Sequence, residues 1–202
     1  MFVKWQNETI VPSKVVCIGR NYVDHIHELN NEVPDNMVVF NKPSSAISQD
    51  LLAFHEEQLH YEGELCFLVQ GGKFVAVGFG IDLTKRTMQS ALKSKGLPWE
   101  RAKAFDGSAV FSEFISIDNL EQDMSLTLSI NEQVIQSGGT SLMIYKPQQI
   151  LDELSTFMTL VDGDVVMTGT PKGVGKINSG DIFRGSISIG NQIVCSHQWH
   201  AK

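Results

Sequence analysis

The chain has few cysteines and no long apolar run. Its 202 residues include only three cysteines, Cys17, Cys66 and Cys195, which are far apart and form no CxxC pair. An odd number of separated cysteines argues against a disulfide framework and favours buried free thiols in a reducing, cytoplasmic compartment. No apolar run approaches the roughly 18 residues of a membrane-spanning helix. Lys4 and Glu8 interrupt the first apolar residues, so we also expect no signal peptide.

Basic residues are scarce as well. Sixteen Lys and Arg against 23 Asp and Glu give a formal net charge of −7. Non-specific nucleic-acid binding needs a basic surface, so we expect no nucleic-acid partner. Hydrophobic residues make up 42% of the chain and there are only six prolines, which excludes a disordered or low-complexity protein. We expect a single domain over residues 1–202, large enough to fold without disulfides.

Most segments show the pattern of β-strands, being short, rich in β-branched or aromatic residues and bounded by Gly, Asn, Asp or Pro. The predicted strands are Lys14–Gly19, Met37–Phe40, Glu64–Gln70, Phe74–Ile81, Ser125–Ile130, Asp164–Met167, Asp181–Ile189 and Gln192–Ser196. The predicted helices are Tyr22–Asn30, Leu83–Lys95 with Asp82 as its N-cap, and Pro147–Leu160. Strands therefore predominate, which predicts an α+β, β-rich domain around an antiparallel or mixed sheet.

Two glutamates open the most apolar of the predicted strands. Glu62 and Glu64 are separated by one residue, so in a strand their carboxylates lie on the same face. If Gly71–Lys73 forms a three-residue hairpin loop, Asp82 lies opposite Glu62; a two-residue loop would turn Asp82 to the other face. Three converging carboxylates suit a divalent cation such as Mg²⁺ or Mn²⁺. The alternative is a solvated strand edge that carries acidic residues.

Two further groups have a functional and an ordinary interpretation. The loop from Gly169 to Lys176 resembles a phosphate-binding loop only superficially, because its glycine spacing is wrong and Ile177 stands where Ser or Thr is needed. His25 and Glu28 would share one face of the predicted helix Tyr22–Asn30. By themselves they form either an ordinary ion pair or a catalytic pair.

Six short motifs occur in an order that resembles one enzyme family. They are Gly19-Arg-Asn-Tyr22 with Asp24-His25, Asn41-Lys-Pro-Ser44, Glu62-x-Glu64, Asp82-Leu-Thr-Lys-Arg86-x-x-Gln89, Lys95-Gly-Leu-Pro-Trp99 with Ala102-Lys103, and Thr168-Gly-Thr-Pro-Lys-Gly-Val-Gly175. The ordered set runs from about residue 15 to about residue 185. It is similar to the fumarylacetoacetate hydrolase superfamily, and most similar to its short, single-domain branch of acylpyruvate hydrolases, oxaloacetate decarboxylases and oxaloacetate tautomerases.

The resemblance implies a fold and a set of site residues. The fold is a β-rich roll of mixed sheets with a few short helices, usually as a homodimer. The implied metal ligands for Mg²⁺ or Mn²⁺ are Glu62, Glu64 and Asp82; the implied catalytic residues are His25 and Glu28, on a mobile lid of about residues 20–35, and Lys103; the implied substrate-pocket residues are Lys42, Arg86, Gln89 and Thr170. The chain departs from its relatives in a shorter segment between Glu64 and Asp82 and in Tyr61, where relatives tend to have His.

These residues predict an enzyme that acts on small 2,4-dioxo acids such as oxaloacetate and acylpyruvates. The metal would stabilise an enolate, Lys103 would add positive charge beside it, and His25 would act as general base. Enol–keto tautomerisation, decarboxylation and hydrolysis all share this enolate, so the pattern predicts the intermediate better than the reaction. The alternatives are an isomerase or hydratase of an aromatic-degradation pathway, and an inactive module that binds a metal and a 2-oxo acid.

Overall fold

The computed structural model describes residues 1–29 and 32–202. Its helices are α1 (Val23–Glu28), α2 (Arg86–Ser94), α3 (Glu100–Lys103) and α4 (Pro147–Ser155), with short 3₁₀ turns at Ser44–Ala46 and Thr140–Leu142. Its strands are β1 (Val3–Trp5), β2 (Glu8–Ile10), β3 (Lys14–Gly19), β4 (Val38–Pro43), β5 (Ile47–Ser48), β6 (Phe54–His55), β7 (Glu57–Gln58), β8 (His60–Tyr61), β9 (Gly63–Gln70), β10 (Lys73–Asp82), β11 (Ala109–Phe111), β12 (Ile115–Ser116), β13 (Met124–Ile130), β14 (Gln133–Gly139), β15 (Val165–Met167), β16 (Gly175–Lys176), β17 (Ile182–Ile189) and β18 (Gln192–His200). The predicted β-rich α+β class is confirmed.

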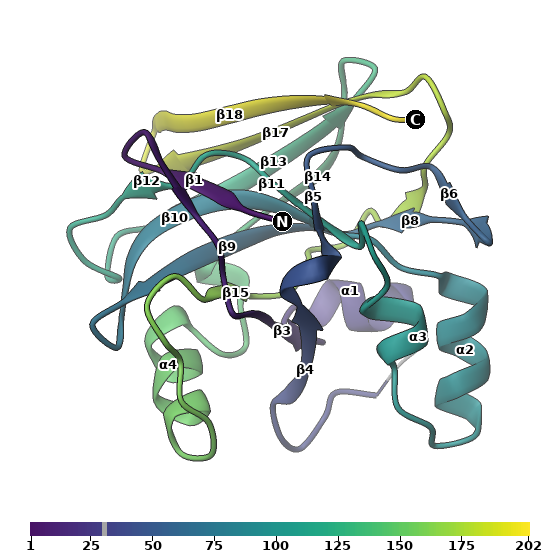
Figure 1. Ribbon diagram of the computed structural model, residues 1–202, viewed down its shortest axis with the longest axis horizontal. Coiled ribbons are helices and arrows are strands. Elements are labelled where there is room, and N and C mark those ends of the chain that lie inside the picture. Colours follow the sequence, from purple (N-terminus) through teal and green to yellow (C-terminus); the bar gives the residue numbers. More distant parts are fainter. Residues whose placement is uncertain (30–31) are drawn as a thin grey trace.

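Two sheets form the body of the molecule. The larger is a mixed sheet with the strand order β4-β3-β15-β9-β10-β11-β5, in which β12 also pairs with β10; the smaller is antiparallel with the order β14-β13-β17-β18. Figure 1 shows the smaller sheet along the top, the larger sheet curling beneath it, and the helices on the lower side. The mixed, curled arrangement is the one that the resemblance implies.

Strand β9 is buried on both faces, which explains its unbroken apolar sequence. Phe67 and Val69 belong to the main core, together with residues of the four-stranded sheet such as Leu128 and Phe183. Cys66 and Leu68 point the other way, into a second apolar cluster. Side chains alternate along a strand, so Glu62 and Glu64 continue the face of Cys66 and point away from the four-stranded sheet.

The hairpin of β9 and β10 has the predicted register at Asp82, but its loop differs from the prediction and a β-bulge compensates for the difference. Its loop has two residues, Gly71 and Gly72, both with positive φ, and not the three that we expected. Such a loop alone would turn Asp82 to the wrong face. A β-bulge between Phe74 and Ala76 inserts one extra residue, Val75, and shifts the pairing by one. Asp82 therefore lies opposite Glu62, and its backbone N–H donates to the Glu62 carbonyl at 2.9 Å.

The helices are shorter than the sequence predicts. The predicted helix Leu83–Lys95 begins only at Arg86, and Asp82 is not its N-cap but the last residue of β10. Backbone hydrogen bonds between Thr84 and His60 keep the intervening segment extended. The predicted helix Pro147–Leu160 ends at Ser155. The helix predicted for Tyr22–Asn30 is α1, Val23–Glu28; Asn30 and Asn31 lie outside the described residues.

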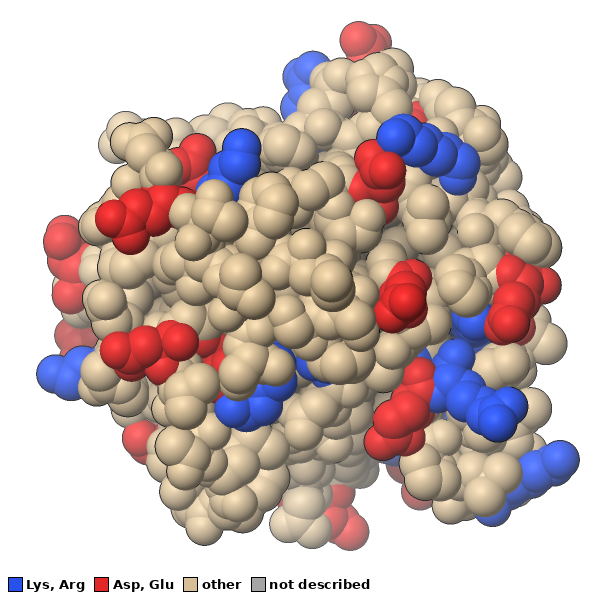
Figure 2. All heavy atoms as spheres, in the orientation of Figure 1, with Lys and Arg blue, Asp and Glu red and all other residues tan. Residues whose placement is uncertain are grey.

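The surface and the thiols agree with the composition. All three cysteines are free and buried, as expected. The longest helices of the described part of the chain, α2 and α4, have nine residues each, and none there is long and apolar enough to cross a membrane. Figure 2 shows a face on which acidic and basic side chains are interspersed, without a continuous basic patch on that face.

Candidate active site

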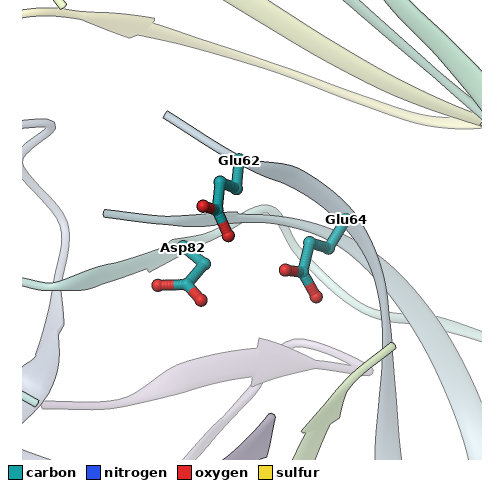
Figure 3. Close-up of side chains that lie close together, drawn as sticks. All are labelled: Glu62, Glu64 and Asp82. Atoms are coloured by element: carbon teal, nitrogen blue, oxygen red, sulfur yellow. The ribbon is translucent and has the colours of Figure 1, made fainter. Parts of the chain in front are cut away.

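Three buried carboxylates meet at the end of the hairpin. Glu62 lies just before β9, Glu64 within it, and Asp82 at the end of β10. One carboxylate oxygen of each lies within 4.8 Å of the others, and all three side chains are buried. Figure 3 shows the carboxyl groups directed into a common space. The alternative of a solvated acidic strand edge is wrong, because Glu62, Glu64 and Asp82 are only 7%, 2% and 1% exposed.

Two buried lysines hold the carboxylates. The Lys103 ammonium, at the end of α3, donates to Glu62 Oε2 and Asp82 Oδ2, both at 2.9 Å, and to Thr84 Oγ1 at 2.6 Å. Lys42 Nζ, in β4, lies 2.8 Å from Asp82 Oδ1. It also donates to the backbone carbonyl of Lys103. Lys42 therefore holds both the Asp82 carboxylate and the backbone of Lys103 in place. Each lysine is nearly inaccessible to solvent.

The three carboxylates differ in how well their charge is compensated. Burial favours protonation of Glu62, but the Lys103 and Arg86 cations beside it hold its pKa well below the ordinary value. Burial raises the pKa of Glu64 well above its ordinary value, and the Asp82 and Glu62 charges raise it further. Within residues 1–29 and 32–202, only the Gly169 N–H donates to its carboxylate, at 2.6 Å. The site therefore holds more negative charge near Glu64 than the protein alone stabilises.

This arrangement fits a divalent cation with oxygen ligands. Glu62, Glu64 and Asp82 supply carboxylate oxygens, the donors that Mg²⁺ and Mn²⁺ prefer. A cation among them would offset the repulsion that raises the pKa of Glu64. The predicted ligand set is thus brought together by the fold.

A second group of residues extends the site along α2. Arg86 Nη2 donates to Glu62 Oε1 at 2.5 Å, and Arg86 Nη1 donates to Gln89 Oε1 at 2.7 Å. Both side chains line the pocket over the carboxylates, as predicted. Thr170 lines it as well, but its hydroxyl donates to the Gly63 carbonyl at 2.9 Å and accepts from Gln136 at 2.9 Å. Its hydroxyl therefore fastens the 169–176 loop to β9.

His25 and Glu28 form the expected pair on α1. His25 Nδ1 lies 3.1 Å from Glu28 Oε2, and Glu28 Oε1 accepts the Gly173 N–H at 2.9 Å. Gly173 has φ +102°, and a Cβ there would lie 2.3 Å from the Ile135 carbonyl oxygen, so only glycine fits. Ile26 is fully buried and docks the helix. His25 lines the pocket together with the three carboxylates.

The pocket lining corrects one prediction and adds to the others. Lys42 does not line it; the side chain lies beneath Asp82 because β4 runs along the outer edge of the large sheet behind the ligand cluster. Arg20 and Lys93 line the pocket but were not among the predicted site residues. Arg20 lies in the motif Gly19-Arg-Asn-Tyr22, close in the sequence to His25. That closeness to a predicted catalytic residue could have identified it.

Comparisons with known proteins agree with this site. The family model described as fumarylacetoacetate (FAA) hydrolase C-terminal matches residues 14–195. The chain is 40% identical over 187 residues to the oxaloacetate tautomerase YcgM of Escherichia coli, covering 84% of this chain and 85% of that one. It is 36% identical over 191 residues to the mitochondrial oxaloacetate tautomerase FAHD1 of Homo sapiens, covering 86% of each.

Solved structures share the fold. The fumarylpyruvate hydrolase of Pseudomonas aeruginosa, in complex with Mn²⁺ and pyruvate, superimposes with a TM-score of 0.88 at 25% identity and covers 100% of this chain and 95% of its own. The 5-carboxymethyl-2-hydroxymuconate delta-isomerase of Mycobacterium smegmatis superimposes with a TM-score of 0.76 at 30% identity, covering 96% of this chain and 80% of its own.

Proposed function

The chain belongs to the fumarylacetoacetate hydrolase family, and from this premise we propose that it is a divalent-metal-dependent oxaloacetate tautomerase that also cleaves related 2,4-dioxo acids. The observation that carries the proposal is the buried cluster of Glu62, Glu64 and Asp82 beside Lys103 and the His25–Glu28 pair. The relatives named above as oxaloacetate tautomerases are 36–40% identical over most of the chain.

The proposed cofactor is Mg²⁺ or Mn²⁺, held by Glu62, Glu64 and Asp82. When bound, the ion acts as a Lewis acid that favours the enolate of a 2-oxo acid. The solved fumarylpyruvate hydrolase contains Mn²⁺ together with pyruvate, which supports this cofactor class. Arg86 and Gln89, which line the same pocket, are proposed to bind and orient the substrate carboxylate.

His25 is proposed as the general base. Its Nδ1 faces Glu28, so an N–H at Nδ1 donates to the carboxylate and the lone pair of Nε2 remains for a proton. Glu28 is itself fixed by the Gly173 N–H, which sets the orientation of the imidazole ring. In tautomerisation His25 takes or returns the C3 proton; in cleavage it activates the water that attacks the C4 carbonyl.

Lys103 is proposed to stabilise the enolate oxygen. Its ammonium is buried, and despite that burial the Asp82 and Glu62 carboxylates raise its pKa above the ordinary value. The lysine therefore keeps its positive charge at neutral pH. A fixed charge beside a developing oxyanion acts strongly in a pocket from which water is excluded.

We propose that the segment of about residues 20–35 closes over the substrate as a lid. In the described part of this segment, the side-chain hydrogen bonds and ion pairs to the 169–176 loop are the exposed ion pair Lys172–Asp24 at 2.9 Å and the Glu28–Gly173 hydrogen bond. Oxalate, a mimic of the enolate, should slow hydrogen exchange in this segment when added with Mg²⁺. Unchanged exchange in residues 20–29 and 32–35, with slowed exchange elsewhere in the pocket, would exclude the lid.

The decisive experiment follows the ultraviolet absorbance of enol-oxaloacetate mixed with the protein. With Mg²⁺ or Mn²⁺ the enol band should decay faster than in buffer, and EDTA should abolish the difference. His25→Ala should reduce cleavage of an acylpyruvate more than tautomerisation, because only cleavage requires an activated water. Decay at the buffer rate with either metal, while oxalate still binds, would identify an inactive binding module.

Two related activities are the second candidates, each favoured by one comparison. The similarity to a fumarylpyruvate hydrolase favours hydrolysis of an acylpyruvate, and the similarity to a hydroxymuconate isomerase favours an isomerase of aromatic degradation. Turnover of a panel of 2-oxo acids, compared by kcat/KM with Mg²⁺ and with Mn²⁺, distinguishes these reactions. Tautomerisation of oxaloacetate should give the largest value.

We also propose an oligomeric state and a cellular location. We propose a homodimer, because the family resemblance implies one, and a cytoplasmic location, because all three thiols are free and buried. Light scattering at micromolar concentration should give twice the chain mass; a monomer would contradict the dimer.

A further inference from the structure

A buried glutamine of the four-stranded sheet reaches toward the active site. Gln136 lies on the edge strand β14 and is only 1% exposed. Its oxygen accepts the Gly63 N–H at 2.9 Å, and its NH₂ group donates to the Thr170 hydroxyl at 2.9 Å and to the Pro171 carbonyl at 2.8 Å. Because an N–H can only donate and a carbonyl can only accept, these partners determine the orientation of the amide. Burying an amide is costly unless its polar atoms are paired, and here they are.

The backbone of Gly63 depends on this side chain. Strand β15 pairs with β9 from Leu68 to Cys66, and Gly63 lies beyond that end. Its N–H and its carbonyl point to the side that β15 occupies further along β9, where Gln136 accepts the N–H and the Thr170 hydroxyl donates to the carbonyl at 2.9 Å. Two side chains therefore continue the hydrogen-bond ladder where the strand stops.

Gly63 stands between two of the proposed metal ligands. The 62–63 peptide is held at both edges: the Glu62 carbonyl accepts the Asp82 N–H at 2.9 Å, and the Gly63 N–H donates to Gln136. The side chains of Glu62 and Glu64 leave this segment toward a common space (Figure 3). Rotation of the peptide would turn them apart, so the hydrogen bond from Gly63 to Gln136 stabilises the ligand geometry.

The NH₂ group of Gln136 holds the loop that follows β15. This loop donates two backbone N–H groups to the site, from Gly169 to Glu64 at 2.6 Å and from Gly173 to Glu28 at 2.9 Å. Glu28 in turn orients the imidazole of the proposed general base. One amide therefore connects the strand that carries the ligands with the loop that supports the base.

We propose that Gln136 is a positioning residue, which holds the metal ligands and the general-base pair in place relative to each other. It acts through Gly63 on the ligands and through the loop after β15 on the base. The inference rests on the proposed function for the roles of the cluster and of the base. Hydrogen-bond partners that orient metal ligands typically contribute about 10- to 100-fold to metal affinity or activity.

The first test measures metal affinity. Gln136→Met keeps the length of the side chain and removes its three hydrogen bonds, so the affinity for Mn²⁺, followed by the electron paramagnetic resonance of the free ion, should fall by about 10- to 100-fold. Thr140→Val is the matched control, because this buried hydroxyl follows the end of β14 and accepts the Met124 N–H at 3.2 Å. It should lower the melting temperature and leave Mn²⁺ affinity unchanged. Equal affinity losses in both variants, or none in Gln136→Met, would overturn the proposal.

Thr170 provides a second variant. Its hydroxyl lies between the Gln136 amide and the Gly63 carbonyl, so the three groups form a closed ring of hydrogen bonds. Thr170→Val opens this ring, and Thr170→Ser keeps it. The losses of Mn²⁺ affinity in Gln136→Met and Thr170→Val should not add in the double variant, and additive losses would overturn the joint role. If Gln136→Met fails to fold, equal affinities in Thr170→Val and Thr170→Ser would overturn the proposal.

Amide hydrogen exchange of the metal-free protein tests the positions directly. The Gly63 and Gly173 N–H groups should exchange faster in Gln136→Met than in the wild type, because the strand and the loop lose a common support. Thr140→Val should leave both rates unchanged. Unchanged exchange at both glycines in Gln136→Met would overturn the proposal, whatever the activity.

Turnover separates positioning from a general loss of stability. At saturating Mn²⁺, Gln136→Met should lower kcat for cleavage of acetylpyruvate more than kcat for tautomerisation of oxaloacetate, with little change in either KM, because cleavage depends more on the oriented base. Failure of the proposed function would appear differently: the wild type would turn over neither acid, while Mn²⁺ affinity and amide exchange would still respond to Gln136→Met. An equal fall of the two kcat values would overturn the link between Gln136 and the base.

Discussion

Two buried carboxylate sites lie on the same sheet and are built in opposite ways. Asp164, just before β15, has no exposed surface, and its two oxygens accept from the Ser13 N–H and hydroxyl, the Lys14 N–H and ammonium, and the Val161 N–H. Burial alone would raise its pKa, but these donors lower it below the ordinary value. Among the residues that the structure describes, Glu64 on β9 has one direct donor and two carboxylate neighbours, and its pKa is raised.

The difference distinguishes a structural acid from a binding acid. A carboxylate surrounded by donors is stable as it stands and fastens the N-terminal segment to β15. A carboxylate surrounded by other carboxylates is stable only with a proton or a cation. Both side chains are buried carboxylates, so the neighbours decide the role.

The largest expected effect is that of removing the Lys103 charge from the active site. Lys103→Met should lower kcat for oxaloacetate by about 10²–10³ while metal affinity is retained, because the lysine is assigned to the enolate and not to the ion. Steady-state kinetics and a metal titration measure the two quantities. Lys85→Met is the matched control: this lysine is equally buried but pairs with Glu56 at 2.5 Å, outside the pocket. Equal losses in both variants would assign Lys103 a structural role.

Removing the charge of Asp164, the structural acid, should lower the stability of the protein and leave its activity unchanged. Asp164→Asn should lower the free energy of unfolding by about 2–4 kcal/mol, because its NH₂ group would face donors. The pKa of Asp164 is lower in the folded state, so its contribution is fully present above the unfolded value of 3.8 and is lost as the pH falls through the lower folded value. The deficit should therefore be constant from about pH 5 to pH 8 and shrink in more acidic solution, as chemical denaturation can measure.

A neighbouring aspartate provides the control for that loss. Asp162 accepts one hydrogen bond, from the Gly71 N–H at 2.7 Å, at an exposed position. Asp162→Asn should cost much less stability than Asp164→Asn. Similar losses would mean that the number of donors does not decide the stability of the carboxylate.

The same change at the binding site should have the opposite sign. Glu64→Gln should stabilise the metal-free protein at neutral pH by about 1 kcal/mol, because a neutral amide keeps the Gly169 hydrogen bond without the repulsion from Asp82 and Glu62. The raised pKa means that this gain is absent below the ordinary value and grows as the pH rises. Mg²⁺ or Mn²⁺ should raise the melting temperature of the wild type but not of the variant; a destabilised variant would contradict this view of Glu64.

The smallest effect on stability and activity is expected at an ion pair that is exposed to solvent. Asp24 pairs with Lys172 at 2.9 Å, and both side chains are 67% exposed. Solvent and salt screen such pairs, so Asp24→Asn should leave the melting temperature within about one degree of the wild type and kcat/KM within about threefold. Differential scanning fluorimetry and kinetics test both. A large loss of activity at unchanged stability would show that this ion pair controls the lid.

Much of the fold and of the metal cluster could be predicted from local patterns. The i, i+2 spacing of Glu62 and Glu64 and the apolar run after them fix the face of the strand, and the facing of Asp82 follows from the register. The loop was predicted with the wrong length, because no residue pattern marks a bulge at Val75. The start of α2 was predicted too early, because the extended conformation of Thr84 depends on pairing with His60, which is distant in the sequence.

The pocket itself was predicted less well, for a related reason. Lys42 and Arg20 are both basic residues in matching motifs, and only the packing of β4 behind the cluster, and of the turn after β3 beside it, separates a supporting lysine from a pocket arginine. Motifs identify which residues gather at a site. They do not determine the side from which each one approaches.

Because of the bulge at Val75, the face on which Asp82 lies depends on the register of the hairpin and not on which side chains its tip carries. Residues at the hairpin tip can be exchanged without moving the carboxylate, provided that their number stays the same. Deletion of Val75 removes the bulge and leaves Asp82 opposite Glu62, whereas loss of the bulge at unchanged length would present Ile81 to Glu62. Any change at the hairpin tip that shifts the pairing of Asp82 by one residue would therefore break the ligand cluster, far from the reaction that it would abolish.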